Sequence, residues 1–255
     1  MGSPLVTLIR NLHDRKGRRR EARALAEGVR LVEEAVAAGI PMHGAALDAE
    51  AGPDARRDAV VAALVARGVP IERVSSRVFA DLAATDTPQG IVVVVEPPMR
   101  TLAELDPARG PILALDAVQD PGNVGTLLRT AWALGAAGAV LLKGTADPFN
   151  AKVVRSAMGA TFRFPIAVAD VDEFLGWAAA AALPIWAATM DGEASGRARL
   201  PERLVLVVGN EGAGLRPEIL AAAAGRIAIP LAVGVESLNV AIAAGILLHE
   251  IRRGR

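Results

Sequence analysis

The sequence predicts an α/β protein of two domains, and three observations support this. The second half of the chain alternates helical segments with short runs that are apolar throughout, such as ILAL, AVLL and LVLVV. Such runs are typical of parallel strands that are buried on both faces. A chain of 255 residues, of which 52% are hydrophobic, is long enough for two hydrophobic cores. Finally, Pro97 and Pro98 follow a β-branched run at 91–95 and mark a domain boundary.

The N-terminal domain is predicted to span residues 1–98, with a linker at 99–108. Helices are expected where apolar residues recur at helical spacing, as they do in 28–38, which Gly39 ends. The predicted helices are 5–12, 28–38, 55–66 and 76–83, and the predicted strands are 45–47, 70–74 and 91–95. This pattern indicates a small α/β domain.

The C-terminal domain is predicted to span residues 109–255, with a cleaner alternation of strands and helices. The predicted strands are 111–116, 138–142, 184–189, 203–208 and 226–229. The predicted helices are 123–134, 151–158, 171–182, 214–222 and 238–252. Because ligands bind at the carboxyl ends of the strands in such folds, polar residues that follow a strand are the candidate ligand contacts.

Charge and composition exclude several classes of protein. Lys+Arg and Asp+Glu both total 28, so the chain lacks the overall positive field of a simple nucleic-acid binder. The absence of cysteine excludes disulfides and thiolate chemistry, and His13, His43 and His249 are too far apart for a local metal motif. No metal is therefore expected. Because no secretory signal or long uncharged apolar run is present, we expect a soluble cytoplasmic protein.

A first motif, DPGNVGTLLRTA at 120–131, follows the strand that ends at Asp116. Pro121 and Gly122 form a turn, and Asn123 is predicted to cap the helix that holds Arg129. A helix start of this kind suits an anion, and the long Arg129 side chain can reach back toward the strand ends. The alternative is that Asn123 only caps the helix and Arg129 is a surface charge.

A second motif, VVGNEGAGL at 207–215, runs from a strand into a glycine-rich loop that contains Glu211. From Gly209 the glycine spacing is G-x-x-G-x-G, which differs from the dinucleotide-binding pattern, and no P-loop string is present. A generic nucleotide-binding enzyme is therefore disfavoured. The glycines either let a ligand approach the backbone or only form a tight turn.

A third motif, IPLAVGVESLNVAIA at 229–243, leads from a short strand into the last helix. Ser237 and Asn239 are both plausible caps for that helix. Two cap-type residues on either side of Leu238 exceed what one helix requires, and the surplus points to a ligand.

Basic residues gather near the N-terminus despite the neutral net charge. Residues 10–23 hold seven Arg and Lys side chains against Asp14 and Glu21, which suits phosphate contacts. The alternative is a flexible charged surface loop. A second candidate is the segment DPFN at 147–150, which precedes a helix with Lys152 and Arg155. It is either an anion-binding helix start or a solvated helix face.

The three motifs, in this order, resemble those of the SpoU family of RNA ribose methyltransferases. The stretch DPFNAKVVRSAMGATFRFPI at 147–166 also looks like the family. In the N-terminal part, LIRNLHDRKGRRREARALAEGVRLVEEA and DTPQGIVVVV resemble the substrate-binding domain that is fused to many members. The resemblance therefore covers nearly the whole chain.

This resemblance implies a C-terminal α/β knot of the SPOUT type, threaded as a trefoil, with a smaller N-terminal α/β RNA-binding domain. It implies S-adenosylmethionine as cofactor, held at Thr189, Gly209, Ile229 and Leu238. It also implies a catalytic set of Arg129, Asn123, Glu211, Ser237 and Asn239, in which Glu211 anchors its loop with Arg129 as its candidate partner.

The reaction implied is methylation of a ribose 2′-hydroxyl in RNA by a homodimer, with ribosomal RNA as the favoured substrate. The alternatives are a transfer RNA ribose methyltransferase and a non-catalytic RNA-binding protein that keeps the fold. The RNA contacts expected on this basis are Arg10, His13, Lys16, Arg18, Arg19, Arg20, Lys152 and Arg155.

Overall fold

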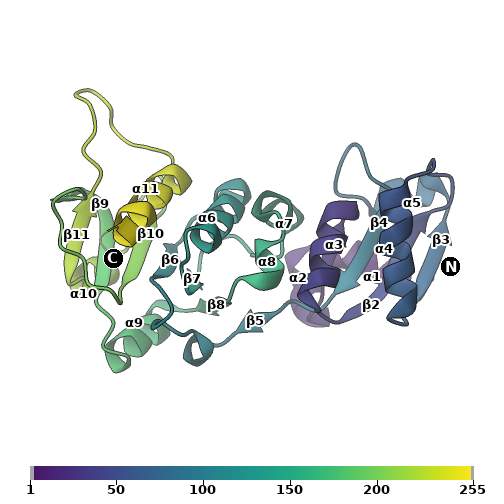
Figure 1. Cartoon of the computed structure of the whole chain (residues 1–255), viewed down its shortest axis with the longest axis horizontal. Coiled ribbons are helices and arrows are strands. Elements are labelled where there is room, and N and C mark those ends of the chain that lie inside the picture. The colour runs from purple at the N-terminus through teal and green to yellow at the C-terminus, as the bar shows by residue number, and fades with distance from the viewer. Residues whose placement is uncertain (1–2, 254–255) are drawn as a thin grey trace. The chain divides into compact units, whose positions relative to one another are not determined.

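The computed structural model describes residues 3–253, which form two units (Figure 1). The first unit contains the described residues up to Pro98 together with Phe149–Arg163. The second contains Met99–Pro148 and the described residues from Phe164 onward. The sequence alone assigns 149–163 to the C-terminal domain, so this segment groups differently from the expectation.

A four-stranded mixed sheet lies at the centre of the first unit, in the order β1-β4-β2-β3. Strand β4 is antiparallel to both of its neighbours, and β2 is parallel to β3. The strands are β1 (Ala24–Glu27), β2 (Met42–Asp48), β3 (Ile71–Val74) and β4 (Ile91–Val95). The helices before the boundary are α1 (Pro4–Leu12), α2 (Arg15–Glu21), α3 (Val29–Ala38), α4 (Ala55–Ala66) and α5 (Ser76–Leu82).

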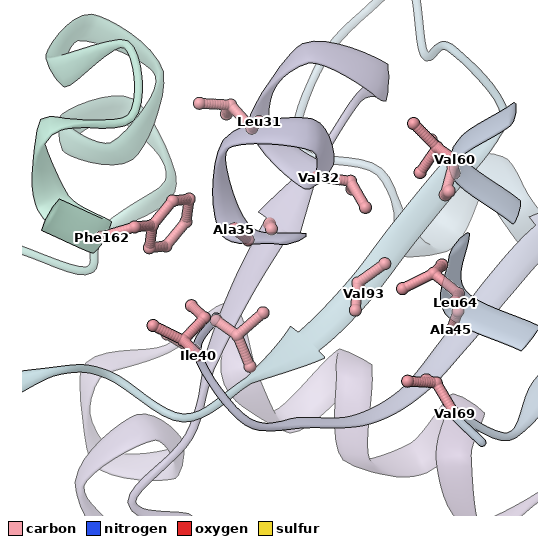
Figure 2. Close-up of a cluster of buried hydrophobic side chains, with 14 of the residues drawn as sticks. Leu31, Val32, Ala35, Ile40, Ala45, Val60, Leu64, Val69, Val93 and Phe162 are labelled. Carbon is pink, nitrogen blue, oxygen red and sulfur yellow. The ribbon is translucent and has the colours of Figure 1, made fainter. Parts of the chain in front are cut away.

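Strand β4 is buried along its whole length because helices cover both faces of the sheet. Its side chains alternate between two cores, as the pleat of a strand requires. Val92 and Val94 pack in a cluster with residues of α1 and α5. Val93 packs on the opposite face with residues of α3 and α4, in the cluster that Figure 2 shows. The continuous apolar run IVVVV thus follows from burial on both faces.

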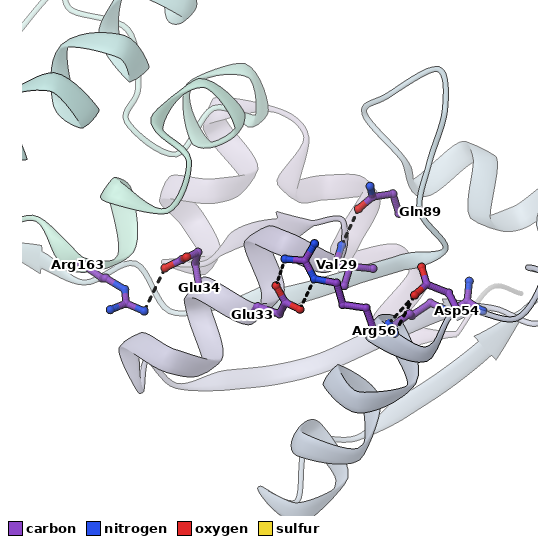
Figure 3. A network of polar contacts seen from close by, with 8 residues as sticks. Val29, Glu33, Glu34, Asp54, Arg56, Gln89 and Arg163 are labelled. Atoms are coloured by element: carbon purple, nitrogen blue, oxygen red, sulfur yellow. Dashed lines mark hydrogen bonds and ion pairs between the residues drawn. The ribbon is translucent and has the colours of Figure 1, made fainter. Parts of the chain in front are cut away.

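The segment 149–163 contributes α7 (Ala151–Ala157) and α8 (Ala160–Arg163) to this unit. Phe149, Val154 and Phe162 belong to the same buried cluster as Val93. Figure 2 shows Phe162 facing Ala35 of α3. Figure 3 shows a peripheral ion pair in which Arg163 lies 3.1 Å from Glu34 of α3. Burial of two phenylalanines and a valine explains why the segment groups with the N-terminal sheet.

Helices α1 and α2 approach each other so closely that the contact admits no side chain at Gly17. A Cβ atom built at Gly17 would lie 1.8 Å from the Asn11 carbonyl oxygen. Asp14 starts α2 by accepting from the backbone of Lys16 at 2.6 Å. The basic segment is therefore an ordered helix and not a flexible loop.

We expect Gly17→Ala to destabilise the first unit by about 1–3 kcal/mol or more, because α1 and α2 must separate to admit the methyl group. Thermal unfolding of the full chain measures this. The matched control is Gly176→Ala in helix α9 (Val171–Ala180), where a Cβ meets nothing within 4 Å. There the better helix propensity of alanine should raise stability by roughly 0.5–1 kcal/mol. Equal effects of the two substitutions would contradict the packing argument.

A seven-stranded sheet organises the second unit, in the order β11-β9-β10-β6-β7-β8-β5, and all of its strand pairs are parallel. Parallel pairing agrees with the prediction from the continuous apolar runs. The strands are β5 (Met99–Arg100), β6 (Ile112–Asp116), β7 (Gly138–Leu142), β8 (Ile166–Ala169), β9 (Ile185–Ala194), β10 (Val205–Gly209) and β11 (Gly225–Ala228). The α helices are α6 (Pro121–Ala133), α9 (Val171–Ala180), α10 (Pro217–Ala222) and α11 (Val240–Arg253).

Helices α6 and α11 pack against each other in this unit (Figure 1). The segment between β11 and α11 is a long loop that extends away from the sheet, drawn in yellow in Figure 1. The expected linker at 99–108 is more structured than predicted, because β5 pairs with β8 and Leu102–Glu104 forms a 3₁₀ turn, η1.

None of the helices within the described residues is both long and apolar enough to cross a lipid bilayer. Across residues 3–253, no three His, Asp or Glu side chains converge as a metal site would require.

Candidate active site

The first motif begins α6, but its cap is Asp120 and not Asn123. The Asp120 carboxylate accepts from the Asn123 backbone N–H at 2.8 Å, and Pro121 takes the first helical position. Proline is favoured there because its missing N–H would have no partner in the helix. The predicted capping role of Asn123 is therefore wrong, and its side chain is left for other contacts.

The second motif is a closed five-residue turn. Asn210 and Gly214 exchange two backbone hydrogen bonds, of 3.1 and 2.9 Å. The Asn210 Oδ1 atom accepts from the backbones of Gly212 and Ala213, both at 2.9 Å, and its Nδ2 donates to the Ala117 carbonyl at 3.0 Å. These bonds hold the turn rigidly and present Glu211 at its exposed tip.

Gly209 has a structural reason for lacking a side chain. A Cβ atom there would lie 2.5 Å from the carbonyl carbon of Gly214, so the space is filled by the motif's own loop. Tight-turn packing therefore already requires this glycine. Any ligand contact at Gly209 must be made through its main-chain groups.

Asn239, from the third motif, caps α11. Its Oδ1 accepts from the backbones of Ala241 at 2.9 Å and Ile242 at 3.3 Å. Its Nδ2 is then free to donate to the Asn123 Oδ1 at 2.9 Å. Ser237 is exposed in the preceding loop and makes no side-chain hydrogen bond with another described residue. Of the two candidate caps, Asn239 takes the role.

One line of side chains joins the three motifs. Asn123 accepts from Asn239 and donates through Nδ2 to the Glu211 Oε1 at 2.5 Å. Glu211 and Asn239 lie 88 and 116 positions after Asn123 in the sequence, yet both contact its side chain. Glu211 anchors its loop as expected, but through Asn123 and not through Arg129.

Beside this line lies an open groove of about 640 Å³ between α6 and α11. Asn123 and Asn239 are among its polar residues, and the α11 residues along it are mainly small or apolar. The full lining is Asn123, Thr126, Thr130, Asn239, Ala241, Ile242, Gly245, Ile246 and His249. His249 is exposed on α11 and lines this groove.

Arg129 is exposed on α6, six residues beyond Asn123. Within residues 3–253 it forms no ion pair with a carboxylate, so the expected Glu211–Arg129 contact is absent there. A guanidinium that no carboxylate of the described residues neutralises is suited to an external anion such as an RNA phosphate.

Thr189, Gly209 and Ile229 lie on or directly after three neighbouring strands. Val207 of β10 is level with Ala187 of β9, and Gly209 and Thr189 each lie two residues further along. Ile229 follows β11, which pairs with β9. Parallel strands place these three positions at one edge of the sheet. Leu238, the fourth predicted cofactor residue, lies half-buried at the end of the long loop before α11.

Next to this edge, the pKa of Asp191 is held below its ordinary value. The Thr189 hydroxyl is the main cause, and the Arg226 guanidinium, 2.8 Å away, adds to it. The carboxylate is therefore the form present at neutral pH.

Two residues that the sequence analysis did not single out form an ion pair beside the second motif, in which the carboxylate is buried and the arginine is partly exposed. The Asp116 side chain is 1% exposed and lies 2.6 Å from the Arg216 guanidinium. Two features of the sequence could have drawn attention to them: Asp116 is a carboxylate at the end of an apolar strand, and Arg216 directly follows a glycine-rich loop. Nothing in their spacing indicates that they meet.

The eight predicted RNA contacts divide into exposed and structural groups. Arg18 is buried, and its Nη1 donates to the carbonyls of Leu12 and His13, both at 2.8 Å. His13 contacts the Leu82 carbonyl through Nε2 at 2.9 Å. Both side chains tie the end of α1 to its surroundings. Burial keeps Arg18 from contacting RNA, which corrects that expectation, whereas His13 is half-buried and its RNA contact stays a prediction.

The remaining six differ in exposure and in their partners. Lys16, Arg19 and Lys152 are exposed. Arg10 and Arg20 are exposed and pair with Asp81 at 3.7 Å and with Glu21 at 2.7 Å. Arg155 is half-buried, and its Nη1 atom is fully covered by protein.

Comparison with known families accounts for both units. Residues 110–249 match the SpoU rRNA Methylase family, and residues 3–93 match the MRM3-like substrate binding domain. The chain belongs to the SpoU rRNA methylase family. The resemblance drawn from the three motifs is thereby confirmed, and so is the α/β class of its fold.

Relatives of this SpoU family member extend over both units. The 23S rRNA (guanosine(2553)-2′-O)-methyltransferase RlmP of Bacillus subtilis is 36% identical over 246 residues, which is 95% of this chain and 94% of the relative. An AdoMet-bound rRNA methyltransferase from Sinorhizobium meliloti is 36% identical with a TM-score of 0.88, covering 98% of this chain and 95% of that one. The SpoU methyltransferase AviRb from Streptomyces viridochromogenes, in complex with AdoMet, is 26% identical with a TM-score of 0.88, covering 99% and 98% of the two chains.

Proposed function

We propose that this protein transfers a methyl group from S-adenosylmethionine to a ribose 2′-hydroxyl of ribosomal RNA. The observation that carries the proposal is the line Glu211–Asn123–Asn239, which joins the three family motifs at one point. The name of the Bacillus subtilis relative supports both the 2′-O position and ribosomal RNA. A ribosomal RNA substrate would also place the enzyme's work in the cytoplasm.

The residues at the strand ends fit S-adenosylmethionine. Within the segment 229–238 of the described chain, one backbone hydrogen bond forms, from Val235 N–H to the Ala232 carbonyl at 3.1 Å. The other main-chain groups of this loop remain available to a ligand. Because adenosine has hydrogen-bond donors and acceptors on its edge, main-chain groups near Gly209, Ile229 and Leu238 suit it, with Thr189 beside them.

S-adenosylmethionine supplies an electrophilic methyl group on a sulfonium. With the cofactor bound, this chain's residues would hold the ribose oxygen while the methyl–sulfur bond breaks, the oxygen–methyl bond forms and the hydroxyl proton passes to water; such positioning contributes on the order of several kcal/mol. We assign this task to the asparagine line, with Ser237 nearby in the loop, and phosphate binding to Arg129. A guanidinium keeps its proton and is a poor base, so orienting the hydroxyl is the physically easier role for Arg129.

For the first unit we propose RNA binding through the exposed basic residues of α2. The double variant Lys16→Gln/Arg19→Gln should weaken RNA binding and reduce the salt slope, log Kd against log salt concentration, by about one to two units for duplex RNA segments. Filter binding at several salt concentrations measures this. Arg18 is excluded from the variant because it is buried.

The matched control for that measurement is Arg30→Gln/Arg73→Gln, which removes two exposed charges from α3 and β3 of the same unit. It should leave the slope unchanged. If both double variants reduce the slope equally, α2 has no special part in RNA binding.

We also propose that the enzyme is a homodimer with the family's trefoil knot. Supporting the dimer, Trp132 of α6 and Ile242 and Ile246 of α11 are 39%, 56% and 37% exposed. A cluster of exposed apolar side chains is typical of an interaction surface. Sedimentation of the purified protein tests the dimer, and an experimental structure with bound cofactor tests the threading.

The experiment that tests the proposed function is methyl transfer from labelled S-adenosylmethionine to separate pools of ribosomal and transfer RNA, followed by nucleoside analysis. A 2′-O-methyl nucleoside in unmodified ribosomal RNA is the expected result. Label only in transfer RNA would make the protein a transfer RNA ribose methyltransferase. RNA binding without cofactor binding would instead favour the non-catalytic RNA-binding protein.

A further inference from the structure

The ion pair Asp116–Arg216, whose carboxylate is buried, ties the residue after the second motif to the ends of strands β6 and β7. Asp116 is the last residue of β6 and accepts twice from Arg216, from its backbone N–H at 2.8 Å and from Nε at 2.6 Å. The Nη2 atom of Arg216 donates to the carbonyl of Lys143, the residue after β7, at 2.8 Å. One arginine at the end of the motif is thus fixed to two neighbouring strand ends.

Burial of Asp116 makes its hydrogen bonds to Arg216 necessary. A carboxylate taken out of water is costly unless it is paired and hydrogen-bonded, and Asp116 is fully buried. Both Asp116 oxygens are occupied by Arg216, so the arginine backbone is held as firmly as its side chain. Arg216 therefore has a single well-defined position.

The same strand end also anchors the start of the second motif. Asn210 donates to the carbonyl of Ala117, which directly follows Asp116. Both ends of the loop, at Asn210 and Arg216, are thereby attached to residues 116–117. The stretch between them is closed on itself and carries Glu211, whose carboxylate receives the Asn123 amide.

We propose that Asp116 and Arg216 are positioning residues for methyl transfer, which act by holding Glu211 where it meets Asn123. The inference rests on the proposed function and adds two residues to its site. Neither residue contacts substrate or cofactor in this assignment. Their effect on the reaction passes through Glu211 and, from it, through Asn123 and Asn239.

Arg216→Ala leaves a buried carboxylate unpaired and risks unfolding, so the main test uses gentler changes. Arg216→Lys keeps the charge but loses the planar fork that reaches two acceptors, and Asp116→Asn keeps the shape but loses the charge. We expect each to lower kcat at least tenfold at saturating S-adenosylmethionine and RNA, with KM for both within about threefold. Hydrogen exchange of the peptide that contains 210–214 should become faster in both.

Two controls separate positioning from general stabilisation of the fold. Arg100→Ala breaks the exposed Arg100–Glu104 pair in the same unit and should change neither kcat nor loop exchange. In a double-mutant cycle, Arg216→Lys added to Glu211→Gln should cost less than twofold further, because a residue that acts through Glu211 has no effect once Glu211 is replaced.

Additive losses in that cycle would overturn the proposal, as would an unchanged kcat in folded Arg216→Lys. If the wild-type protein methylates no RNA, the proposed function fails, yet loop exchange still decides whether the pair holds the motif. Unchanged exchange in both variants would show that it does not.

Discussion

Arg129→Ala should leave the protein folded and its affinity for S-adenosylmethionine within a few-fold, while methyl transfer falls by about 10²–10³-fold. The loss is expected because Arg129 is an exposed cation on the helix that also presents Asn123. Its task in the proposed reaction is to hold an RNA phosphate and orient the ribose hydroxyl. Single-turnover transfer with saturating cofactor measures the effect on the chemical step.

Arg129→Lys is the informative companion variant. It keeps the charge but replaces a planar fork by a point charge, so we expect only partial recovery of the rate. Circular dichroism and cofactor titration confirm that each variant is intact. Full activity of Arg129→Ala would remove Arg129 from the catalytic set and return it to the surface-charge interpretation.

The parallel sheet of the second unit could be predicted because its strands are buried on both faces. In runs such as ILALD and GAVLL every residue is buried, and nearly every residue is apolar, so the sequence itself indicates a strand that is covered on both faces. Strand β8 was missed for the opposite reason. It is four residues long, Pro165 precedes it, and Val168 within it is 53% exposed.

Helix α2 could not be predicted from apolar periodicity, because its sequence RKGRRRE has none. The helix depends on the Asp14 cap and on the close approach of Gly17 to α1. The same limitation applies to Arg18, which looks like its exposed neighbours in sequence but is buried by that approach. Only the tertiary contact separates a structural arginine from one that is available to RNA.

For the site, the sequence indicated which segments matter but not which atoms meet. Each of the three motifs follows a strand, and this position predicts that they meet at the edge of the sheet formed by the carboxyl ends of its strands. Asn123 was assigned as a cap because Asn is a good cap, yet Asp120 followed by Pro121 competes better for the helix start. The pairing of Glu211 with Asn123, and of Asp116 with Arg216, depends on register between strands far apart in the chain.

Asn123→Ala tests the central contact of the proposed site. The substitution removes both hydrogen bonds of the line, the one to Glu211 at 2.5 Å and the one from Asn239 at 2.9 Å. We expect methyl transfer to fall by about 10–100-fold, since a misplacement of about 1 Å in a positioned group can cost on the order of 100-fold in rate. Stability should change little, because Asp120 still caps α6 and alanine is a good helix former.

The matched control for Asn123→Ala is Asp170→Ala, which should lower stability and leave methyl transfer nearly unchanged. Asp170 caps α9 by accepting from the Glu173 backbone at 2.9 Å. Asp170→Ala should lower stability by about 1 kcal/mol and leave transfer within twofold. We therefore expect Asn123→Ala to lose activity but not stability, and Asp170→Ala to lose stability but not activity. This contrast distinguishes a role in the site from a role in the fold. If Asn123→Ala instead lowers the melting temperature as Asp170→Ala does and retains its rate, the line that joins the motifs is structural.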